Sequence, residues 1–362
     1  MADLDSKEEI AKIDTKNVLG SIDALSDQCL HAWEDASKVE VPDYYKDVQN
    51  IVMCGMGGSG LGARVIESVY AAEILMPLVR VNDYHLPGFV DLHSLVICSS
   101  YSGETEETVQ NAKEAIEKKA KWMAIGTGNS LIELAEKEGV PFYKIEPKFN
   151  PSNQPRMAIG YSILGQLVLA SKADLFKIDK GDIDKITSTM NDVRKRYSQS
   201  VDFANNDAKK LASSIKDRVC LFMAGGHLVG ATHVLNNQMN ENSKNISFDF
   251  QIPEINHHLM EGLAHPTKNS ENIAVVFVNS TLYEDRIKQR VEITKEVVSK
   301  NNIPIYEINL TSSTKISQSF ELIQFGAYVN FYLSVLYDLD PAPIQWVDYF
   351  KERLGQPLGK QY

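Results

Sequence analysis

The stretch IVMCGMGGSGLGARVIESV, residues 51–69, decides the fold class that we predict for this chain. An apolar run leads into a glycine-rich centre, and a helical pattern follows it. The centre contains Gly55, Gly57, Gly58, Ser59 and Gly60. This order predicts a strand, a tight turn and the start of a helix, where free backbone amides cradle a phosphate group.

The glycine-rich turn leaves the identity of its ligand open. Gly55, Gly57 and Gly60 satisfy the dinucleotide fingerprint G-x-G-x-x-G. Asp83, 23 residues beyond Gly60, stands where a ribose-binding acid is expected. Taken alone, the turn fits both a nicotinamide cofactor and the phosphate of a small substrate.

The composition predicts a globular protein with two domains of ordinary size. The chain has 362 residues, of which 43% are hydrophobic, enough to fill two packed cores. Its apolar runs are much shorter than the roughly 18 residues that suggest a membrane span, and the acidic opening MADLDSKEEIAKID differs from a signal peptide. A net charge of -11 argues against nucleic acid, because phosphate backbones require clustered Lys and Arg. We therefore expect neither a membrane nor a nucleic acid as partner.

The cysteines predict a reducing compartment. They are Cys29, Cys54, Cys98 and Cys220. They lack C-x-x-C spacing, and the last three lie within apolar, strand-like runs. We expect buried thiols and a cytoplasmic location.

Strand-like and helical patterns alternate in two runs, which predicts an α/β fold. The expected strands are 50–55, 77–83, 94–100, 121–127 and 141–146 in the first run, then 219–226, 246–250, 273–279 and 304–310 in the second. Near-continuous apolar strands between helices are typical of a parallel sheet covered on both faces. We also expect helices in 7–38 and in the polar segment 179–215.

These patterns predict two three-layer αβα subdomains with helical extensions at both ends. The weak similarity between IVMCGMGGSG and VCLFMAGGHLVG favours one ancestral unit used twice. The expected ranges are a helical segment 1–45, a first α/β domain 46–170, a helical connection 171–215, a second α/β domain 216–340 and a helical tail 341–362.

Hydroxyl side chains follow the third expected strand. They stand in CSSYSGETEET, which contains Ser100, Ser102, Gly103 and Thr105. One interpretation is a capping box, in which Thr105 is the N-cap and the side chain of Glu107 or Thr108 forms the reciprocal hydrogen bond to its backbone. The other is an anion site at a helix start. Ligands of parallel sheets bind in the crevice at the carboxyl edge, so two such turns on one sheet favour a phosphomonoester over a dinucleotide.

The two turns together make a family resemblance visible. GMGGSG followed by SSYSGETEET resembles the sugar isomerase (SIS) domain. The stretches QPRMAIGYS, NQMNENSK, PEINHHLMEG and DPAPIQWVDYFKERL are similar to those of the bifunctional phosphoglucose/phosphomannose isomerases of archaea and bacteria. The resemblance implies two SIS domains, a homodimer, and interconversion of glucose 6-phosphate and mannose 6-phosphate with fructose 6-phosphate, with no metal and no cofactor.

The resemblance also implies roles for single residues. Glu241 in NQMNENSK matches the base that moves a proton between C1 and C2. Arg156, after Pro155 in QPR, matches the cation that faces the enediolate oxygens. His257 matches a ring-opening histidine contributed by the partner subunit, and Lys351 matches a lysine that contacts the sugar.

The resemblance assigns the phosphate of the substrate to the two turns at the edge of the first sheet. We expect it to be bound by Gly57, Gly58, Ser59, Ser100, Ser102 and Thr105.

The sequence departs from the family pattern at two positions. His258 stands where relatives more often carry Asn, which leaves open whether its ring or that of His257 faces the sugar. Adjacent residues of an extended segment point to opposite sides, so we expect one ring to serve. Ala342 replaces an expected small hydroxyl residue and affects the balance between the epimers.

Three other functions are weighed against the isomerase. A metal site at His257, His258 and His265 lacks a carboxylate or thiol at ligand spacing. A non-catalytic sugar-phosphate sensor would keep the phosphate turns without the catalytic residues, and such sensors usually carry a DNA-binding domain. A nicotinamide-dependent oxidoreductase would use the fingerprint and Asp83.

Overall fold

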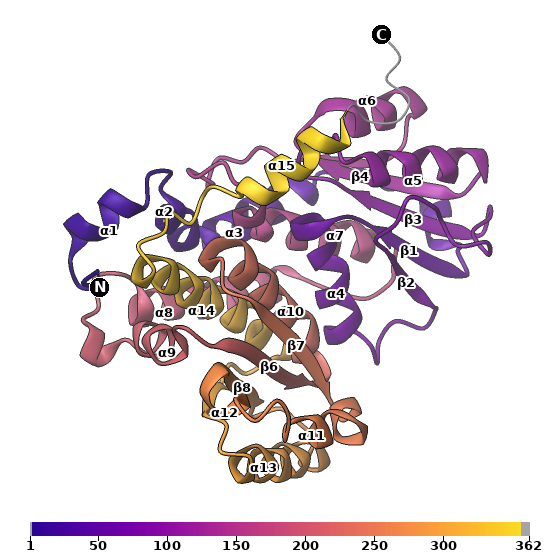
Figure 1. Ribbon diagram of the computed structural model, residues 1–362. Helices are drawn as coiled ribbons and strands as arrows, with labels where there is room; N and C mark the ends of the chain where they lie inside the picture. The colour runs from indigo at the N-terminus through magenta and orange to yellow at the C-terminus, as the bar shows by residue number, and fades with distance from the viewer. Residues whose placement is uncertain (1, 356–362) are drawn as a thin grey trace. The chain divides into compact units, whose positions relative to one another are not determined.

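The computed structural model describes residues 2–355, which divide into two compact units (Figure 1). The first-sheet unit comprises residues 27–63, 70–183 and 342–355, and the second-sheet unit comprises residues 2–26, 64–69 and 184–341. Each unit contains one parallel sheet. The predicted α/β class with two helix-flanked parallel sheets is confirmed.

The first sheet has the strand order β2-β1-β3-β4-β5, and every neighbouring pair is parallel. Its strands are β1 (Asn50–Cys54), β2 (Leu78–Val81), β3 (Ser94–Ser99), β4 (Lys121–Gly126) and β5 (Phe142–Lys144). Consecutive residues of β1 from Ile51 to Cys54 are all buried. Both faces of the sheet are therefore covered, which explains the near-continuous apolar runs.

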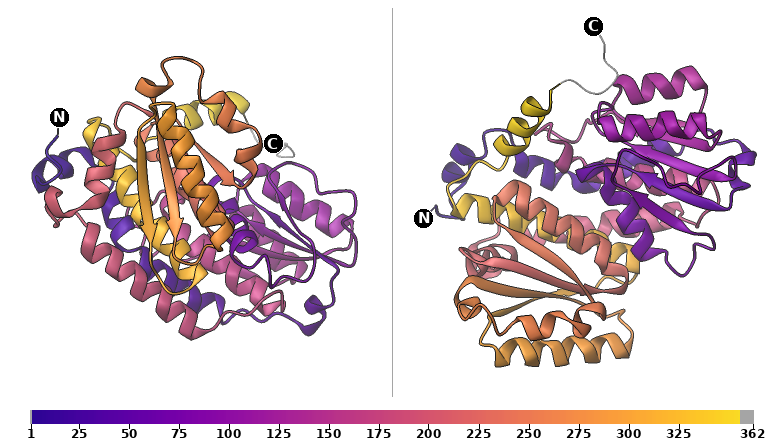
Figure 2. Two further views of the ribbon diagram at one scale, coloured as in Figure 1. Left: turned by 90° about the horizontal axis from the view of Figure 1, so that it is seen from below. Right: turned by 45° about the vertical axis from the view of Figure 1, so that its right-hand side comes forward.

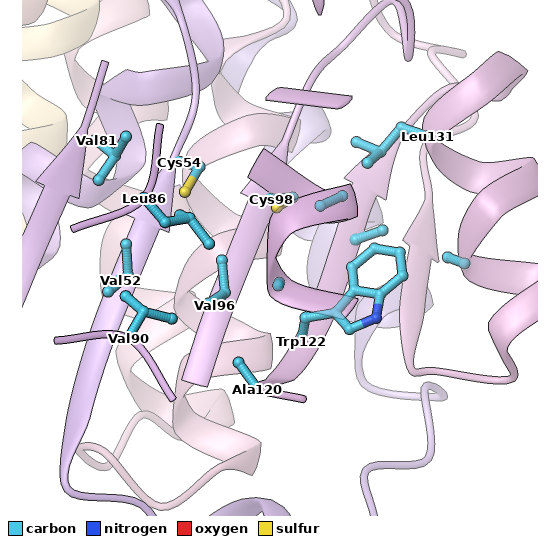
Figure 3. Packing of buried hydrophobic residues seen from close by; sticks show 14 of the residues in the cluster. Val52, Cys54, Val81, Leu86, Val90, Val96, Cys98, Ala120, Trp122 and Leu131 are labelled. Carbon is cyan, nitrogen blue, oxygen red and sulfur yellow. The ribbon is translucent and has the colours of Figure 1, made fainter. Parts of the chain in front are cut away.

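One face of the first sheet packs against α5 (Glu106–Glu117) and α6 (Asn129–Glu138). Figure 3 shows Val52, Cys54 and Val96 among the side chains of this core. On the other face lies α7 (Ile159–Lys172), where a Cβ at Gly165 would lie 2.7 Å from the Tyr143 ring. This close approach holds the middle of α7 against the sheet.

The second sheet has the order β7-β6-β8-β9 and is also parallel throughout. Its strands are β6 (Val219–Gly225), β7 (Ser247–Ile252), β8 (Ile273–Ser280) and β9 (Ile305–Leu310). The helix α13 (Asp285–Lys300) covers one face, and α10 (Val229–Gln238) and α14 (Lys315–Leu336) lie on the other (Figure 2). From Ile316 to Leu336 every residue of α14 is buried, as expected of a helix that is apolar on all sides.

The remaining helices agree with the predicted helical segments. Residues 7–38 form α1 (Lys7–Ile13), α2 (Val18–Asp23) and α3 (Leu25–Ala36), and residues 179–215 form α8 (Lys180–Tyr197) and α9 (Asp207–Ile215). The others are α4 (Leu61–Val69), α11 (Leu259–Gly262), α12 (Asn269–Asn272) and α15 (Gln345–Leu354). Across residues 2–355, none of these helices has the length and apolarity needed to span a bilayer.

The expectation of buried thiols is confirmed. Cys29, Cys54, Cys98 and Cys220 are all free and buried. Burial raises the pKa of the Cys29 thiol and of the Cys220 thiol. The Cys29 and Cys220 thiols are therefore protonated at neutral pH. Cys54 and Cys98 pack in the core of the first sheet.

Candidate active site

The strand order of the first sheet reverses between β1 and β3. The chain leaves β1 for its neighbour β2 on one side and then returns to β3 on the other side. Ligands of open parallel sheets bind where the strand order reverses in this way, outside the carboxyl ends of the strands. The short helix η2 (Gly57–Gly60) follows β1 at this edge, and the segment 100–105 follows β3. The fold thus brings both predicted phosphate turns to one place.

A positive φ at Gly57 and close backbone packing at Gly60 explain two glycines of the first turn. Gly57 has φ +48°, a conformation that side-chain-bearing residues rarely adopt. A Cβ at Gly60 would lie 2.6 Å from the Gly55 oxygen, and a Cβ at Gly58 would lie 3.4 Å from the Arg156 Cα. The turn therefore lies directly against the backbone of the predicted catalytic arginine.

Ser59 joins the two turns. Its Oγ accepts the backbone N–H of Tyr101 at 2.9 Å, across from β1 to the residue that follows Ser100. The side chain is 9% exposed. Within residues 2–355 its own hydroxyl proton is donated to no protein acceptor, so it is available to an oxyanion at the crevice.

The hydroxyl turn is organised around Ser100. This fully buried residue donates its hydroxyl proton to Thr105 Oγ1 at 2.9 Å and accepts the Gly103 N–H at 3.1 Å. Ser100 is thereby committed to the shape of the turn. Ser102 is exposed and its Oγ accepts the Glu104 N–H at 3.2 Å, which leaves its proton available to bind an anion.

The capping-box interpretation of this turn is wrong. Thr105 is the N-cap of α5, as expected, but its side chain accepts no backbone N–H of the first helical turn. Its Oγ1 receives the Ser100 hydroxyl instead. The hydroxyl of Thr105 therefore remains as a hydrogen-bond donor at the start of α5, which favours the anion-site interpretation.

Two residues on α7 that sequence reasoning missed hold the glycine turn from behind. The Gln166 Nε2 donates to the Ser59 carbonyl at 2.8 Å and to Ser99 Oγ at 3.2 Å, and Ser162 Oγ donates to the Gly58 carbonyl at 3.4 Å. Binding these carbonyls to α7 leaves the opposite side of the turn to its N–H groups. The available signal was a pair of polar residues four apart in an otherwise apolar helix.

Arg156 is buried at the base of this arrangement. It lies on the short helix η3 (Pro155–Met157) and is 3% exposed, so it is not a surface arginine. Its Nη1 donates to Gln154 Oε1 at 2.9 Å, and its Nη2 donates to the Ala342 carbonyl at 2.5 Å. These two oxygens orient the guanidinium, and Ala342 acts through its backbone.

The segment that carries Arg156 is fixed at both ends by one buried side chain. The Gln28 Nε2 on α3 donates to the Phe149 carbonyl at 3.1 Å and to the Met157 carbonyl at 2.9 Å. The Phe149 N–H in turn donates to the hydroxyl of Tyr161, whose pKa is raised by burial to about 12. Gln28 and Tyr161 are further positioning residues that sequence patterns did not reveal.

The remaining predicted residue of the first-sheet unit, Lys351, lies on α15 and is exposed. The same helix exposes Trp346 by 74% and Phe350 by 61%. It begins three residues after Ala342, whose carbonyl is bound to Arg156. The chain that carries Lys351 is therefore anchored at the guanidinium of Arg156.

Glu241 belongs to the second-sheet unit. It lies in a π-helical turn, Met239–Ser243, at the end of α10 and is half-buried. Such turns occur frequently at functional sites. Ser243 Oγ donates to the Asn330 carbonyl at 2.8 Å, and Lys244 Nζ donates to the Asp340 carbonyl at 2.9 Å. Both contacts hold the turn on the C-terminal side of Glu241.

The predicted extended conformation around His257 is wrong. His257 ends the short helix η7 (Glu254–His257), and His258 follows it with φ -148° and ψ -46°. His258 Nε2 lies 2.7 Å from Glu254 Oε2, an i,i+4 pair. His257 is exposed and has no such partner among residues 2–355, so it is the histidine available to a ligand.

The related turn of the second sheet is closed by its own side chains. Gly226, with φ +50°, corresponds to Gly57, but Leu228 stands where the first turn has Ser59. The hydroxyl of Tyr283 accepts the Gly225 N–H at 3.0 Å. Burial lowers the pKa of His227, which contacts Gln318 Oε1 at 2.9 Å. We conclude that this second turn packs the core and that the phosphate turn of the first sheet is the open one.

The two alternative ligands are a metal ion and a dinucleotide. Within residues 2–355, no three His, Cys, Asp or Glu side chains gather as metal ligands. Asp83 is exposed, and its Oδ1 accepts the neighbouring Tyr84 N–H at 2.6 Å. The fingerprint and this acid follow β1 and β2 as in a dinucleotide fold, so position alone leaves that alternative open.

Comparison with known proteins shows the family of the chain. A bifunctional phosphoglucose/phosphomannose isomerase from Caldicellulosiruptor bescii is 31% identical over 341 residues, 93% of this chain and 98% of that protein. The chain belongs to this isomerase family. A namesake from Aquifex aeolicus is 28% identical over 89% of this chain and 94% of that protein. Residues 204–354 also match the model of the bacterial phospho-glucose isomerase C-terminal SIS domain.

Solved structures give the same fold. A hypothetical protein from Thermus thermophilus superposes with a TM-score of 0.72 at 16% identity, covering 97% of this chain and 94% of that one. Membership of the phosphoglucose/phosphomannose isomerase family sets the oxidoreductase alternative aside.

Proposed function

We propose that this protein interconverts glucose 6-phosphate and mannose 6-phosphate with fructose 6-phosphate through a cis-enediolate. The single observation that carries the proposal is the joining of the glycine turn to the hydroxyl turn by Ser59, directly against the backbone of a buried arginine. Such a site offers hydrogen-bond donors to a phosphate and a fixed cation beside it. Family membership supplies the substrate class.

The phosphate is bound by the two turns of the first sheet. Backbone amides of Gly57 and Gly58 and the hydroxyls of Ser59, Ser102 and Thr105 donate to its oxygens. Ser100 contributes by holding Thr105 in place. Pro155, which begins η3, fixes the approach of the backbone to the sugar.

The isomerisation moves one proton between neighbouring carbons. Glu241 accepts the proton from C2 of the open aldose, and the C2–H electron pair forms the C1–C2 double bond while the carbonyl oxygen becomes an enediolate oxygen. The guanidinium of Arg156 stabilises this charge, which develops only as the reaction proceeds. The proton of the C2 hydroxyl passes to the former carbonyl oxygen, and Glu241 returns its proton to C1 while the C2–O bond becomes the carbonyl of the ketose.

Ring opening precedes this step. Neutral imidazole passes a proton between the hydroxyl at C1 and the ring oxygen at neutral pH, and we assign this role to His257, assisted by Lys351. His257 is contributed by the partner subunit of a homodimer in this proposal. We place the reaction in the cytoplasm, where the four free thiols remain reduced, within sugar-phosphate metabolism that includes glycolysis and gluconeogenesis.

A coupled assay tests the proposal. Fructose 6-phosphate is supplied, and glucose 6-phosphate and mannose 6-phosphate are followed separately, each with and without EDTA. We expect both products in both conditions. A Glu241→Gln variant should form neither product at an appreciable rate, whereas Glu261→Gln, an exposed carboxylate on α11, serves as the matched control. Absence of both products from the unmodified protein would contradict the proposal.

A further inference from the structure

Arg286 and Arg290 form a like-charged pair that the proposed chemistry does not use. They lie four residues apart near the start of α13, so their side chains share one face of the helix. Like charges at this spacing repel each other and disfavour the helix. Among residues 2–355, neither guanidinium forms an ion pair with a carboxylate, although the chain carries 48 Asp and Glu.

Both arginines line a surface pocket of about 360 Å³. Its lining consists of Asn256, Met260, Arg286, Gln289, Arg290 and Ile293. These residues lie on η7, α11 and α13, all within the second-sheet unit. The volume is within the range of small-molecule sites, and the lining contains two cations, two amides and two apolar side chains, with no carboxylate.

Neutral groups hold the two guanidiniums in place. Arg290 Nη1 donates to Asn256 Oδ1 at 3.2 Å, and Arg286 Nη1 donates to Gln289 Oε1 at 2.7 Å. The Asn256 amide is fixed in its turn, because its Nδ2 donates to Thr294 Oγ1 at 2.8 Å. Thr294 is 1% exposed and donates to the Arg290 carbonyl at 2.7 Å. Amide oxygens orient a guanidinium but leave its charge uncompensated.

We propose that this pocket is a second anion site, which binds the phosphate group of a small phosphorylated molecule. Two guanidiniums match the charge of a phosphate dianion and offer it paired N–H donors, which a single ammonium group does not. Met260 and Ile293, the latter 49% exposed, offer apolar contact to the body of the ligand. In a protein of net charge -11, such binding depends on a local concentration of positive charge, as this pair provides.

The site is connected to the turn that carries His257. A phosphate that takes the Arg290 Nη1 proton competes with Asn256 Oδ1, and Asn256 directly precedes His257 on η7. Occupancy of the pocket therefore changes the hydrogen bonds of that turn. An effect on ring opening rests on the proposed function, whereas binding to the pocket stands independently of it.

Titration calorimetry with inorganic phosphate tests the proposal on the full chain. Chloride at equal ionic strength is the reference, and four proteins are compared. They are the unmodified chain, R286Q/R290Q, S59A/T105A and the matched control K288Q, whose lysine lies on the same helix and pairs with Asp285. We expect two classes of site in the unmodified chain and in K288Q. R286Q/R290Q should weaken one class at least about tenfold, and S59A/T105A should weaken the other.

The outcomes separate this proposal from the proposed function. Two unaltered classes of site in R286Q/R290Q would overturn the second anion site, whatever S59A/T105A shows. Loss of phosphate binding confined to R286Q/R290Q would support the pocket and contradict the phosphate turns. Sedimentation velocity is measured in parallel, and a smaller species in R286Q/R290Q without altered phosphate binding would overturn the proposal by identifying the pair as a contact between copies. In the unmodified chain, phosphate should also shift the NMR signals of the His257 ring.

Discussion

The Ser59 hydroxyl oxygen lies 2.9 Å from the Tyr101 backbone nitrogen, and this hydrogen bond unites two turns that are far apart in the sequence. It fixes the distance between the donors that the glycine turn and the hydroxyl turn offer to one anion. A phosphate that uses both turns therefore meets a preformed site, and little ordering accompanies its binding.

The first prediction follows from this bond. Ser59→Ala removes the acceptor for the Tyr101 N–H and one donor to the phosphate, and Thr105→Ala removes a second donor. Each variant should weaken substrate binding by about 1–3 kcal/mol per charged hydrogen bond. The measurement is the Michaelis constant for fructose 6-phosphate. A Michaelis constant that is unchanged in both variants would show that the phosphate binds elsewhere.

The second prediction concerns Gln166, which binds the carbonyl of Ser59 from behind. Gln166→Leu leaves that carbonyl unsatisfied and frees the turn, so both the free energy of unfolding and phosphate binding should decrease, each by about 1–3 kcal/mol. Gln324 offers a matched control, because it is equally buried on an apolar helix and donates to the Ile22 carbonyl at 3.2 Å.

Gln324→Leu should destabilise the protein to a similar extent and leave the Michaelis constant unchanged. Thermal unfolding and steady-state kinetics on both variants make the comparison. Equal Michaelis constants in Gln166→Leu and Gln324→Leu would show that Gln166 contributes to stability but not to phosphate binding.

How far the sequence alone predicts this site depends on whether a residue's partner is local. The glycine turn and the strand before it follow from short-range patterns, since φ, close packing and apolar runs are encoded within a few residues. The roles of Ser100 and Gln166 depend on partners brought together by folding. The sequence shows that a hydroxyl or an amide is present, but it does not show which group accepts its hydrogen bond. The capping-box alternative failed for this reason, because Ser100 binds the Thr105 hydroxyl that a cap would use.

A similar limit applies to the histidines. The sequence suggests an extended segment after β7, whereas tertiary packing of Ile255 helps to form the short helix η7. The i,i+4 spacing that joins His258 to Glu254 exists only in such a turn. Which histidine is available could therefore be seen only once the backbone conformation was known.

The third prediction tests the packing of the hydroxyl turn. Gly103 has φ +71°, and a Cβ there would lie 1.9 Å from the Gly128 oxygen. Gly139 has nearly the same φ, +67°, but faces open space. Gly139→Ala should cost about 1–2 kcal/mol from backbone strain alone. Gly103→Ala should cost a further 1–3 kcal/mol, roughly as other overpacked sites do, and should raise the Michaelis constant as well.

Chemical denaturation of the two glycine variants checks this prediction. The comparison isolates steric contact, because both substitutions act on a left-handed backbone. Equal losses of stability in Gly103→Ala and Gly139→Ala would contradict the prediction. They would mean that the hydroxyl turn and the turn after β4 move apart easily to accept the added methyl group.

The fourth prediction concerns the N-terminal segment and pH. Lys209 is fully buried, and its Nζ lies 2.7 Å from Asp5 Oδ1. This hydrogen bond to Lys209 holds the pKa of the Asp5 carboxyl below its usual range. Because the folded-state pKa is depressed, the associated stability is present above the unfolded-state pKa of about 4 and is lost as pH falls through the folded-state value.

Asp5→Asn should therefore lower the free energy of unfolding at pH 7 by about 1 kcal/mol, a modest effect because 38% of the Asp5 side chain is exposed to screening solvent. Its stability should also change less than that of the unmodified chain between pH 5 and pH 3, roughly the range where carboxylates titrate. Asp3→Asn is the control. If the free energy of unfolding changes with pH equally in Asp5→Asn and in the unmodified chain between about pH 5 and pH 3, this result would argue against the Asp5–Lys209 contact.

The fifth prediction separates Glu241 from His257 by the steps assigned to them. Glu241→Gln is nearly isosteric but cannot accept a proton, so turnover should fall on the order of a hundredfold or more for cyclic and open-chain substrates alike. His257→Ala should slow the cyclic hexose phosphates much more than exchange of the C2 proton in an open-chain analogue. His258→Ala is the matched control, since Glu254 already binds that ring. Undiminished turnover in Glu241→Gln, or a greater loss in His258→Ala than in His257→Ala, would refute the assignment.

Mixing the impaired Glu241→Gln and His257→Ala chains tests whether the site is shared between subunits. If His257 serves the site of the partner, a heterodimer of Glu241→Gln and His257→Ala chains contains one site in which both defects combine and one in which neither is present. Co-refolding equal amounts should then form heterodimers as half of all dimers, with one intact site each, and recover about a quarter of the activity of the unmodified protein by simple subunit statistics. A site built within one chain predicts no recovery, because every site then contains one defect. Activity measured against the fraction of heterodimer therefore distinguishes a shared site from two independent ones.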